Sequence, residues 1–94
     1  MIEYRLLVDL EVVVELDSIP KRDRSRLLVY FEKLRAYPEN YAAASERDDR
    51  GRRIEIASHA GWLIYYWIDF ADRHVKIMKV RQVARIDRAK RRKK

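Results

Sequence analysis

Apolar and polar positions follow two different periods along this chain, and the change of period divides it into a helical part and a strand part. Residues 2–8 form an apolar run of strand length, and residues 10–17 then follow helical spacing. A break at residues 18–20 precedes the apolar stripe of residues 21–37, which predicts a second helix that Pro38 ends. We therefore expect an N-terminal strand followed by a helical hairpin.

The second half of the chain has the period of strands. After a polar segment, whose residues 45–51 we interpret as a surface loop, apolar residues alternate with polar ones over residues 53–57, 62–69 and 74–83. The connections are short, so these strands should form a three-stranded antiparallel meander. The N-terminal strand is expected to join the sheet, because its backbone groups would otherwise be unpaired. The prediction is a small α+β domain whose helices cover one face of a sheet and leave the other face open.

Length and composition limit the setting of this domain. Ninety-four residues make one small domain, here expected over residues 1–86 with a basic arm at residues 87–94, and leave little room for a cofactor cavity. The arm is open to interpretation as a helix, a disordered tail or a segment that folds on binding. The absence of cysteine excludes disulfides and fits a reducing cytoplasm. Charged residues interrupt the N-terminal apolar run, so we expect neither a signal peptide nor a membrane span.

Positive charge is concentrated in the C-terminal part. Residues 71–94 contain 11 Lys or Arg and two Asp, a net charge of +9, whereas residues 1–70 contain 11 Lys or Arg and 13 Asp or Glu, a net charge of −2. This asymmetry indicates a polyanionic or acidic partner, although the last five residues are also consistent with a solubilising tail. The expected nucleic-acid-binding residues are Lys76, Lys79, Arg81, Arg85 and Arg88. A solvated edge strand, on which lysine prevents unwanted pairing, is the alternative interpretation.

Three segments of the chain have characteristic residues at defined spacings. Residues 19–38 (Ile-Pro, then Arg24, Leu34 and Pro38) have the spacing of a helical hairpin, residues 53–56 read RIEI, and residues 61–65 read GWLIY. Together with the order of elements, they resemble the RelE/ParE toxin superfamily of bacterial type II toxin–antitoxin modules over roughly residues 2–85. RelE-type members carry two basic residues in the second segment and a G-x-R-L-V-Y pattern in the third.

The resemblance implies a toxin that an acidic antitoxin protein neutralises. RelE-like members cleave mRNA in the ribosomal A site, and ParE-like members poison DNA gyrase. We expect the RelE-like endoribonuclease function on ribosome-bound mRNA, because a C-terminal basic cluster suits an RNA-lined site. The alternatives are a ParE-like gyrase inhibitor, a degenerate member that binds RNA or protein without cleaving, and an unrelated small nucleic-acid-binding protein.

The family's catalytic positions are matched only in part. Arg53 stands at the first basic position of its strand, Glu55 stands at the second with the opposite charge, and Trp62 replaces the arginine that stabilises the scissile phosphate. The last basic position falls near residue 83, flanked by Arg81 and Arg85. Cleavage through the RNA 2′-hydroxyl needs a proton acceptor, a proton donor and positive charge at the phosphate. The candidate catalytic residues are therefore Arg53, Glu55, Arg81 and Arg85.

This catalytic set depends on a shared face of the sheet. Arg53 and Glu55 are two residues apart on a strand, so both lie opposite Ile54 and Ile56, and they face outward if the isoleucines pack under the helices. An RNA-handling site further requires that Arg53 and Arg81 look out from the same side. The alternative is that Arg53 and Glu55 are ordinary solvent-facing residues.

The remaining aromatic and histidine residues have two interpretations each. Trp62 and Tyr66 share one face of their strand and Tyr65 and Trp67 the other, so one pair should lie in the core and the other is available for base stacking or antitoxin contact. His59 is a second candidate proton acceptor or an exposed turn residue. His74 lacks a partner at metal-ligand spacing, so we expect no metal site and no cofactor.

Overall fold

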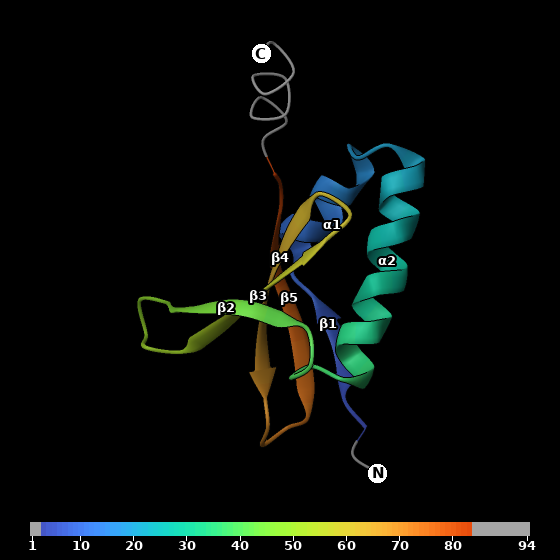
Figure 1. Ribbon diagram of the computed structural model, residues 1–94. Helices are drawn as coiled ribbons and strands as arrows, with labels where there is room; N and C mark the ends of the chain where they lie inside the picture. Colours follow the sequence, from blue (N-terminus) through green and yellow to red (C-terminus); the bar gives the residue numbers. More distant parts are fainter. Residues whose placement is uncertain (1–2, 84–94) are drawn as a thin grey trace.

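The computed structural model describes residues 3–83 and confirms the expected α+β fold with both helices on one face of the sheet (Figure 1). Seven elements follow one another along the chain. They are β1 (Arg5–Val8), α1 (Leu10–Asp17), α2 (Lys21–Ala36), β2 (Ala42–Arg47), β3 (Arg53–His59), β4 (Trp62–Asp69) and β5 (His74–Gln82). The expected basic arm at residues 87–94, which contains Arg88, lies outside the described residues, and so does the candidate residue Arg85.

Local sequence explains where the helices begin and end. The Asp9 side chain caps α1 by accepting a hydrogen bond from the Glu11 backbone N–H, with an O–N distance of 3.0 Å. Ser18 ends the helix, and Pro20 stands immediately before α2, where its missing N–H costs nothing. Pro38 then disfavours helical geometry at Tyr37. None of the helices in the described part of the chain has the length and apolar character needed to cross a membrane.

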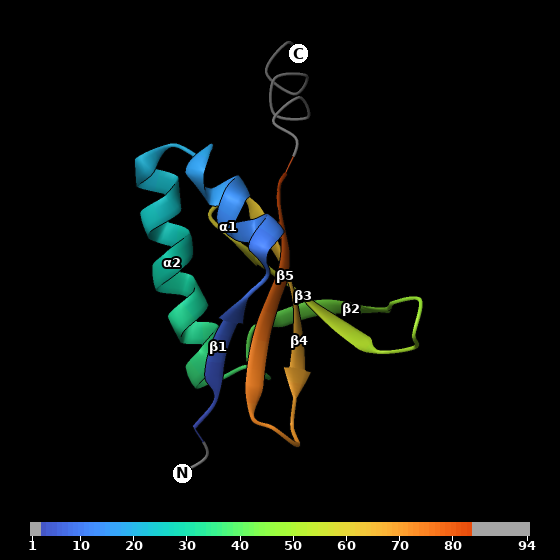
Figure 2. The ribbon, with the colours of Figure 1, turned by 180° about the vertical axis from the view of Figure 1, so that it is seen from behind.

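The sheet differs from the expected one in two details. It has five strands in the order β1-β5-β4-β3-β2, and β1 pairs parallel to β5, whereas the other neighbours are antiparallel (Figures 1 and 2). The parallel pair is possible because α1 and α2 return the chain towards the start of β1 before the other strands follow. The N-terminal strand therefore joins the sheet as predicted, in a mixed rather than a purely antiparallel arrangement.

The additional strand is β2, which occupies part of the segment that we interpreted as a loop. That interpretation was wrong for residues 45–47 and right for the turn that follows. Five of the six residues of β2 are exposed, so the strand is held by backbone pairing with β3 and shows no alternation of apolar residues. In the turn, the Asp48 carboxylate accepts hydrogen bonds from the backbone N–H groups of Arg50 and Arg52, and Gly51 adopts a φ of 80°. The resulting hairpin extends away from the helices (Figure 1).

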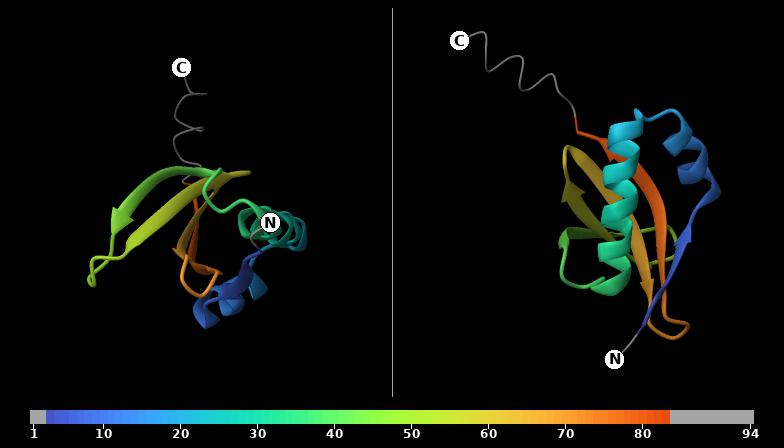
Figure 3. Two further views of the ribbon diagram at one scale, coloured as in Figure 1. Left: turned by 90° about the horizontal axis from the view of Figure 1, so that it is seen from below. Right: turned by 90° about the vertical axis from the view of Figure 1, so that its right-hand side faces the viewer.

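The core lies between the helices and one face of the sheet, and the side view shows α2 lying across that face (Figure 3, right). Alternate residues of β4 are buried there, which are Trp62, Ile64, Tyr66 and Ile68. They pack with buried residues of β5 (Val75, Ile77, Val80) and of the helices (Val12, Leu16, Leu27, Tyr30, Phe31, Leu34). The Tyr66 hydroxyl donates to the Pro38 carbonyl at 2.7 Å, and burial raises the pKa of Tyr66 well above its usual value. The prediction that one aromatic pair lies in the core is thus confirmed for Trp62 and Tyr66.

Candidate nucleic-acid interface

The face of the sheet without helices carries cations interleaved with aromatic rings. In the β4–β5 register Tyr65 lies opposite Lys79 and Trp67 opposite Lys76, and Arg81 lies further along β5 on the same side, opposite Leu63. Tyr65 and Trp67 are half-buried, and Lys79 and Arg81 are exposed. We call the surface formed by Lys76, Lys79, Arg81, Tyr65 and Trp67 the cationic face.

A β-bulge makes this shared face. Lys76 and Lys79 are three residues apart, and in a regular strand they would point to opposite sides of the sheet. The register shifts between Tyr65 and Tyr66, so that one extra residue of β5, Met78, is inserted between the pairs. The shift also lets both Ile77 and Val80 reach the core. The bulge therefore places three cations of β5 on one surface.

Two cations lie over the aromatic rings of this face. The Lys79 Nζ is 5.3 Å from the centroid of the Tyr65 ring, and the Arg52 Cζ is 4.9 Å from that of Trp67. Arg52 is held in place by its Nε, which is 2.7 Å from Asp48 Oδ2. The rings and cations thus form one continuous surface that offers stacking and positive charge to the same ligand. The position of Arg52 depends on the β2–β3 turn, so the sequence alone did not indicate a role for this residue.

Arg53 and Glu55 lie on the other side of the sheet, and their expected placement was wrong. Glu55 is paired with Tyr66, so its side chain and that of Arg53 share the side that the helices cover, beyond the C-terminal end of α2. Ile54 and Ile56 consequently point to the face without helices, and Ile54 is buried there outside the main core. Alternation puts the two pairs on opposite faces, but it does not say which face meets the helices.

The surroundings of Glu55 are those of a paired carboxylate. Glu55 Oε2 is 3.0 Å from Arg53 Nε, and the Glu55 side chain is only 13% exposed, whereas that of Arg53 is 64% exposed. A cavity of about 270 Å³ borders this ion pair, between Glu39, Ala42, Ile68 and Phe70. Because the charge of Glu55 is balanced by Arg53, the arrangement is that of a structural ion pair between neighbours on one strand.

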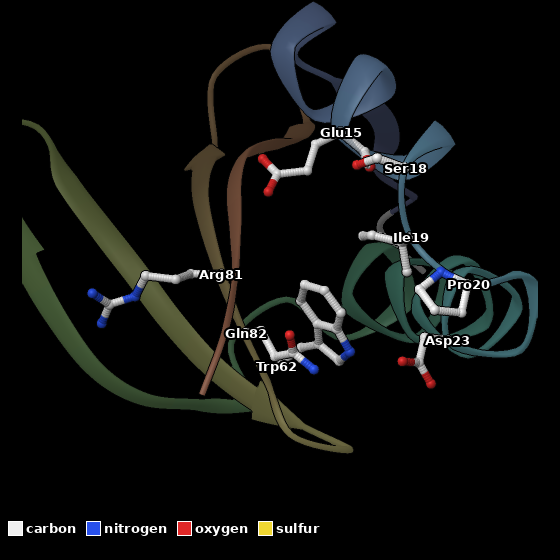
Figure 4. A pocket seen from close by; sticks show the side chains of 8 residues that line it. All are labelled: Glu15, Ser18, Ile19, Pro20, Asp23, Trp62, Arg81 and Gln82. Atoms are coloured by element: carbon white, nitrogen blue, oxygen red, sulfur yellow. Dashed lines mark hydrogen bonds between the residues drawn. The ribbon is translucent and has the colours of Figure 1, made fainter. Parts of the chain in front are cut away.

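Arg81 does not join Arg53. It borders a cavity of about 510 Å³ between the α1–α2 turn and the end of the sheet, but its side chain points away from Trp62 (Figure 4). The same cavity is lined by the carboxylates of Glu15 and Asp23, which disfavour a bound phosphate. Within residues 3–83 the predicted catalytic set is therefore divided: Arg53 and Glu55 on the helix side, and Arg81 on the cationic face. The requirement that Arg53 and Arg81 share a side is not met, so the RNA-handling site that the sequence predicted around Arg53 is wrong. A role in RNA binding now depends on the cationic face without Arg53.

His59 belongs to the packing between β3 and α2. It is the last residue of β3 and is half-buried, with its ring stacked on that of Tyr30 at a centroid distance of 4.2 Å and an interplanar angle of 2°. The adjoining turn is tight because Ala60 and Gly61 both adopt positive φ. Burial lowers the pKa of His59, and the nearby charges of Lys33 and Arg26 lower it further. On this side of the sheet His59 cannot serve the cationic face as a base.

We expect this lowered pKa to make stability depend on pH. Because the folded pKa of His59 lies below the unfolded value of about 6.5, protons bind preferentially to the unfolded chain. The contribution of His59 to the free energy of unfolding is therefore fully present above that value and is lost as the pH falls below it. In thermal denaturation, the decrease in Tm from pH 7.5 to pH 5.5 should be smaller for His59→Phe, which keeps a ring against Tyr30. An equal decrease in both proteins would contradict the prediction.

No protein-family model matches this chain, and no curated protein sequence matches it significantly. Solved structures do match. A chain in the crystal structure of an archaeal RelE–RelB complex from Pyrococcus horikoshii is 24% identical, with a TM-score of 0.72 over 88% of this chain and 98% of that chain. A chain in the toxin–antitoxin complex RelBE2 from Mycobacterium tuberculosis is 17% identical, with a TM-score of 0.75 over 85% of this chain and 98% of that chain.

The matched chains are covered almost completely, so the similarity extends over the whole fold and not only over one motif. This chain therefore has the fold of the matched chains in these two complexes, which is the fold that the sequence resemblance implies.

Proposed function

We propose that this chain is the toxin of a type II toxin–antitoxin module and that it acts in the cytoplasm on ribosome-bound mRNA through the cationic face. The fold that it shares with chains from RelE–RelB and RelBE2 complexes supports the toxin assignment. The observation that carries the RNA target is the alternation of cations and aromatic rings on the open side of β4 and β5.

This surface suits single-stranded RNA. Tyr65 and Trp67 are two residues apart on one strand, which separates their rings by about 7 Å. Each ring can stack on a different base when the cation that lies over it, Lys79 or Arg52, moves to a phosphate. Such stacking contributes about 1–3 kcal/mol per base. Lys76, Lys79 and Arg81 lie beside the rings and balance the charge of the backbone phosphates. A ligand with exposed bases and a polyanionic backbone uses both parts of the surface.

For cleavage, the cationic face supplies positive charge at a phosphate. Arg81 offers a guanidinium for bidentate contact, and Arg85 follows it closely in the chain. Arg53 and Glu55 are on the other side of the sheet, so in this proposal they stabilise the β3 region and do not handle RNA. His59 lies on that side as well, so neither of the proton acceptors considered above reaches the cationic face, and the described part of this face supplies only the positive charge that cleavage needs. This separation favours one second candidate, a member of the same fold that binds RNA without cleaving it.

The proposed partner is an acidic antitoxin that covers the cationic face. Carboxylates of the antitoxin would compete with RNA phosphates for Lys79 and Arg81, because both anions use the same donors. This competition blocks RNA binding, and it therefore neutralises the toxin whether the toxin cleaves the RNA or only binds it. Inhibition of DNA gyrase remains the alternative that the functional experiment distinguishes.

The test is induced expression of the chain alone, followed by analysis of mRNA and plasmid. We expect growth arrest, relief of the arrest by an acidic protein encoded next to this gene, and cut mRNA in a translating extract by primer extension. Uncut mRNA with RNA binding retained would support the non-catalytic candidate, and linearised plasmid would identify gyrase as the target. Normal growth together with no detectable RNA binding would refute the proposal.

A further inference from the structure

A cluster of metal-ligating side chains lies at the turn between β4 and β5, two residues along the strands from Trp67 and Lys76 at the end of the cationic face. The sequence spacing gave His74 no metal-ligand partner, but the turn places two carboxylates beside it. Asp69, Asp72 and His74 each offer one ligand atom, and these atoms all lie within 4.8 Å of one another. Asp69 and His74 are half-buried, and Asp72 is exposed. The cluster combines two carboxylates with an imidazole nitrogen, which distinguishes it from an ordinary group of surface acids.

The fold brings these three residues together. Asp69 ends β4 and lies directly opposite His74 at the start of β5. The Asp72 backbone N–H donates to Asp69 Oδ1 at 3.0 Å, and Arg73 adopts a φ of 59°, which reverses the chain between the two strands. The Arg73 carbonyl accepts from the Arg5 N–H at 2.8 Å, so β1 holds the turn from its other side. The ligand atoms therefore belong to a hairpin turn that these two hydrogen bonds hold in place.

The charges of the cluster are not balanced by its neighbours. Within residues 3–83, the ion pairs are Arg24–Asp17, Arg35–Glu32, Arg52–Asp48 and Arg53–Glu55, and none involves Asp69 or Asp72. Two carboxylates this close repel each other unless a cation lies between them. In the described part of the chain no Lys or Arg forms an ion pair with either carboxylate, which leaves this place open to a different cation.

We propose that Asp69, Asp72 and His74 bind a divalent first-row transition-metal ion, represented by Zn²⁺. Imidazole nitrogen and carboxylate oxygen are both zinc ligands at about 2.0–2.2 Å, whereas Mg²⁺ and Ca²⁺ prefer oxygen alone. Small rotations of the exposed Asp72 side chain bring the ligand atoms to a common centre, and solvent completes the coordination. The ion links β4 to β5 and stabilises the turn. This site is independent of the proposed RNA function.

Isothermal titration with Zn²⁺ tests the site on the full chain. We expect one Zn²⁺ per chain, and affinities at least about tenfold lower for His74→Ala and for Asp72→Asn. The chain contains only two histidines, so His59→Phe is a matched control and should bind Zn²⁺ like the unaltered protein. Circular dichroism confirms that each variant is folded, and Mg²⁺ should compete weakly.

A second measurement locates the ion without relying on affinity. Paramagnetic Ni²⁺ should broaden the His74 ring resonances in NMR spectra before those of His59. His74 pairs with Asp69 at one end of β4, and His59 pairs with Trp62 at the other end. The two histidines are therefore about 23 Å apart along the direction of β4. Zn²⁺ affinity unchanged by His74→Ala, equal broadening of both histidines, or Mg²⁺ binding as tight as Zn²⁺ would each overturn the proposal.

Discussion

Replacing Lys79 and Arg81 together by glutamate is expected to weaken the binding of single-stranded RNA by on the order of 100-fold at 0.1 M salt. Both side chains are exposed on the cationic face, so the double variant removes two phosphate contacts and adds two repulsive charges. Because each phosphate contact on a single strand contributes about 0.7 to the slope of log K against log salt, the slope should decrease in magnitude by about 1.4. Fluorescence anisotropy with a labelled oligonucleotide over a series of salt concentrations measures both quantities.

The matched control is the Lys21→Glu/Arg22→Glu variant. These residues are also exposed and change the net charge by the same amount, but they lie in the first turn of α2, on the helix side of the molecule. We expect the control to bind RNA only slightly more weakly than the unaltered protein, through the general loss of positive charge. Equal losses in the two double variants would show that binding depends on net charge and not on the cationic face. The proposed interface would then be wrong.

Phe31→Ala is expected to lower the free energy of unfolding by about 3–5 kcal/mol. The Phe31 side chain is completely buried between α2 and the sheet, and its removal leaves a cavity that the surrounding strands cannot close. Domains of this kind have a total stability of about 5–15 kcal/mol, so the variant should be close to unfolding at 25 °C. Urea denaturation followed by circular dichroism measures the change in the midpoint.

Val29→Ala on the same helix is the control for this prediction. The Val29 side chain is 62% exposed, so the substitution removes little buried area, and alanine favours the helix slightly. We expect a change within about 0.5 kcal/mol. If Phe31→Ala were as mild as Val29→Ala, the contact between α2 and the sheet would not be the main source of stability, and the order of layers described above would be incorrect.

The sequence predicted those elements that bury apolar residues with a regular period. Both helices and β3, β4 and β5 have such a pattern, and the structure places them close to the expected residues. β2 has none, because its side chains are exposed and its stability comes from backbone pairing with β3. A strand of this kind is recognised only when its neighbour is known, since hydrogen bonding of the backbone does not depend on the identity of the side chains.

The candidate site was predicted less well than the fold. Residues two apart on a strand share a face, which correctly grouped Arg53 with Glu55 and Tyr65 with Trp67. The sequence does not indicate which of these pairs faces the helices, because apolar residues occur on both sides of β3 and β4. Ile54 is buried on the open side and Tyr66 on the covered side. The orientation of the sheet against the helices decided the question, and it separated Arg53 from Arg81.

By itself, the amino-acid sequence determined the α+β architecture, the concentration of cations near the end of the chain and the pairing of residues on each strand. These properties follow from local periodicity and composition, which each segment carries independently of the others. Only the tertiary structure decided that Lys76, Lys79 and Arg81 share a face with Tyr65 and Trp67. The reason is the bulge in β5, which inserts one extra residue between Ile77 and Val80 and lets both of them reach the core. The extra residue reverses the side of the sheet to which every later side chain of β5 points.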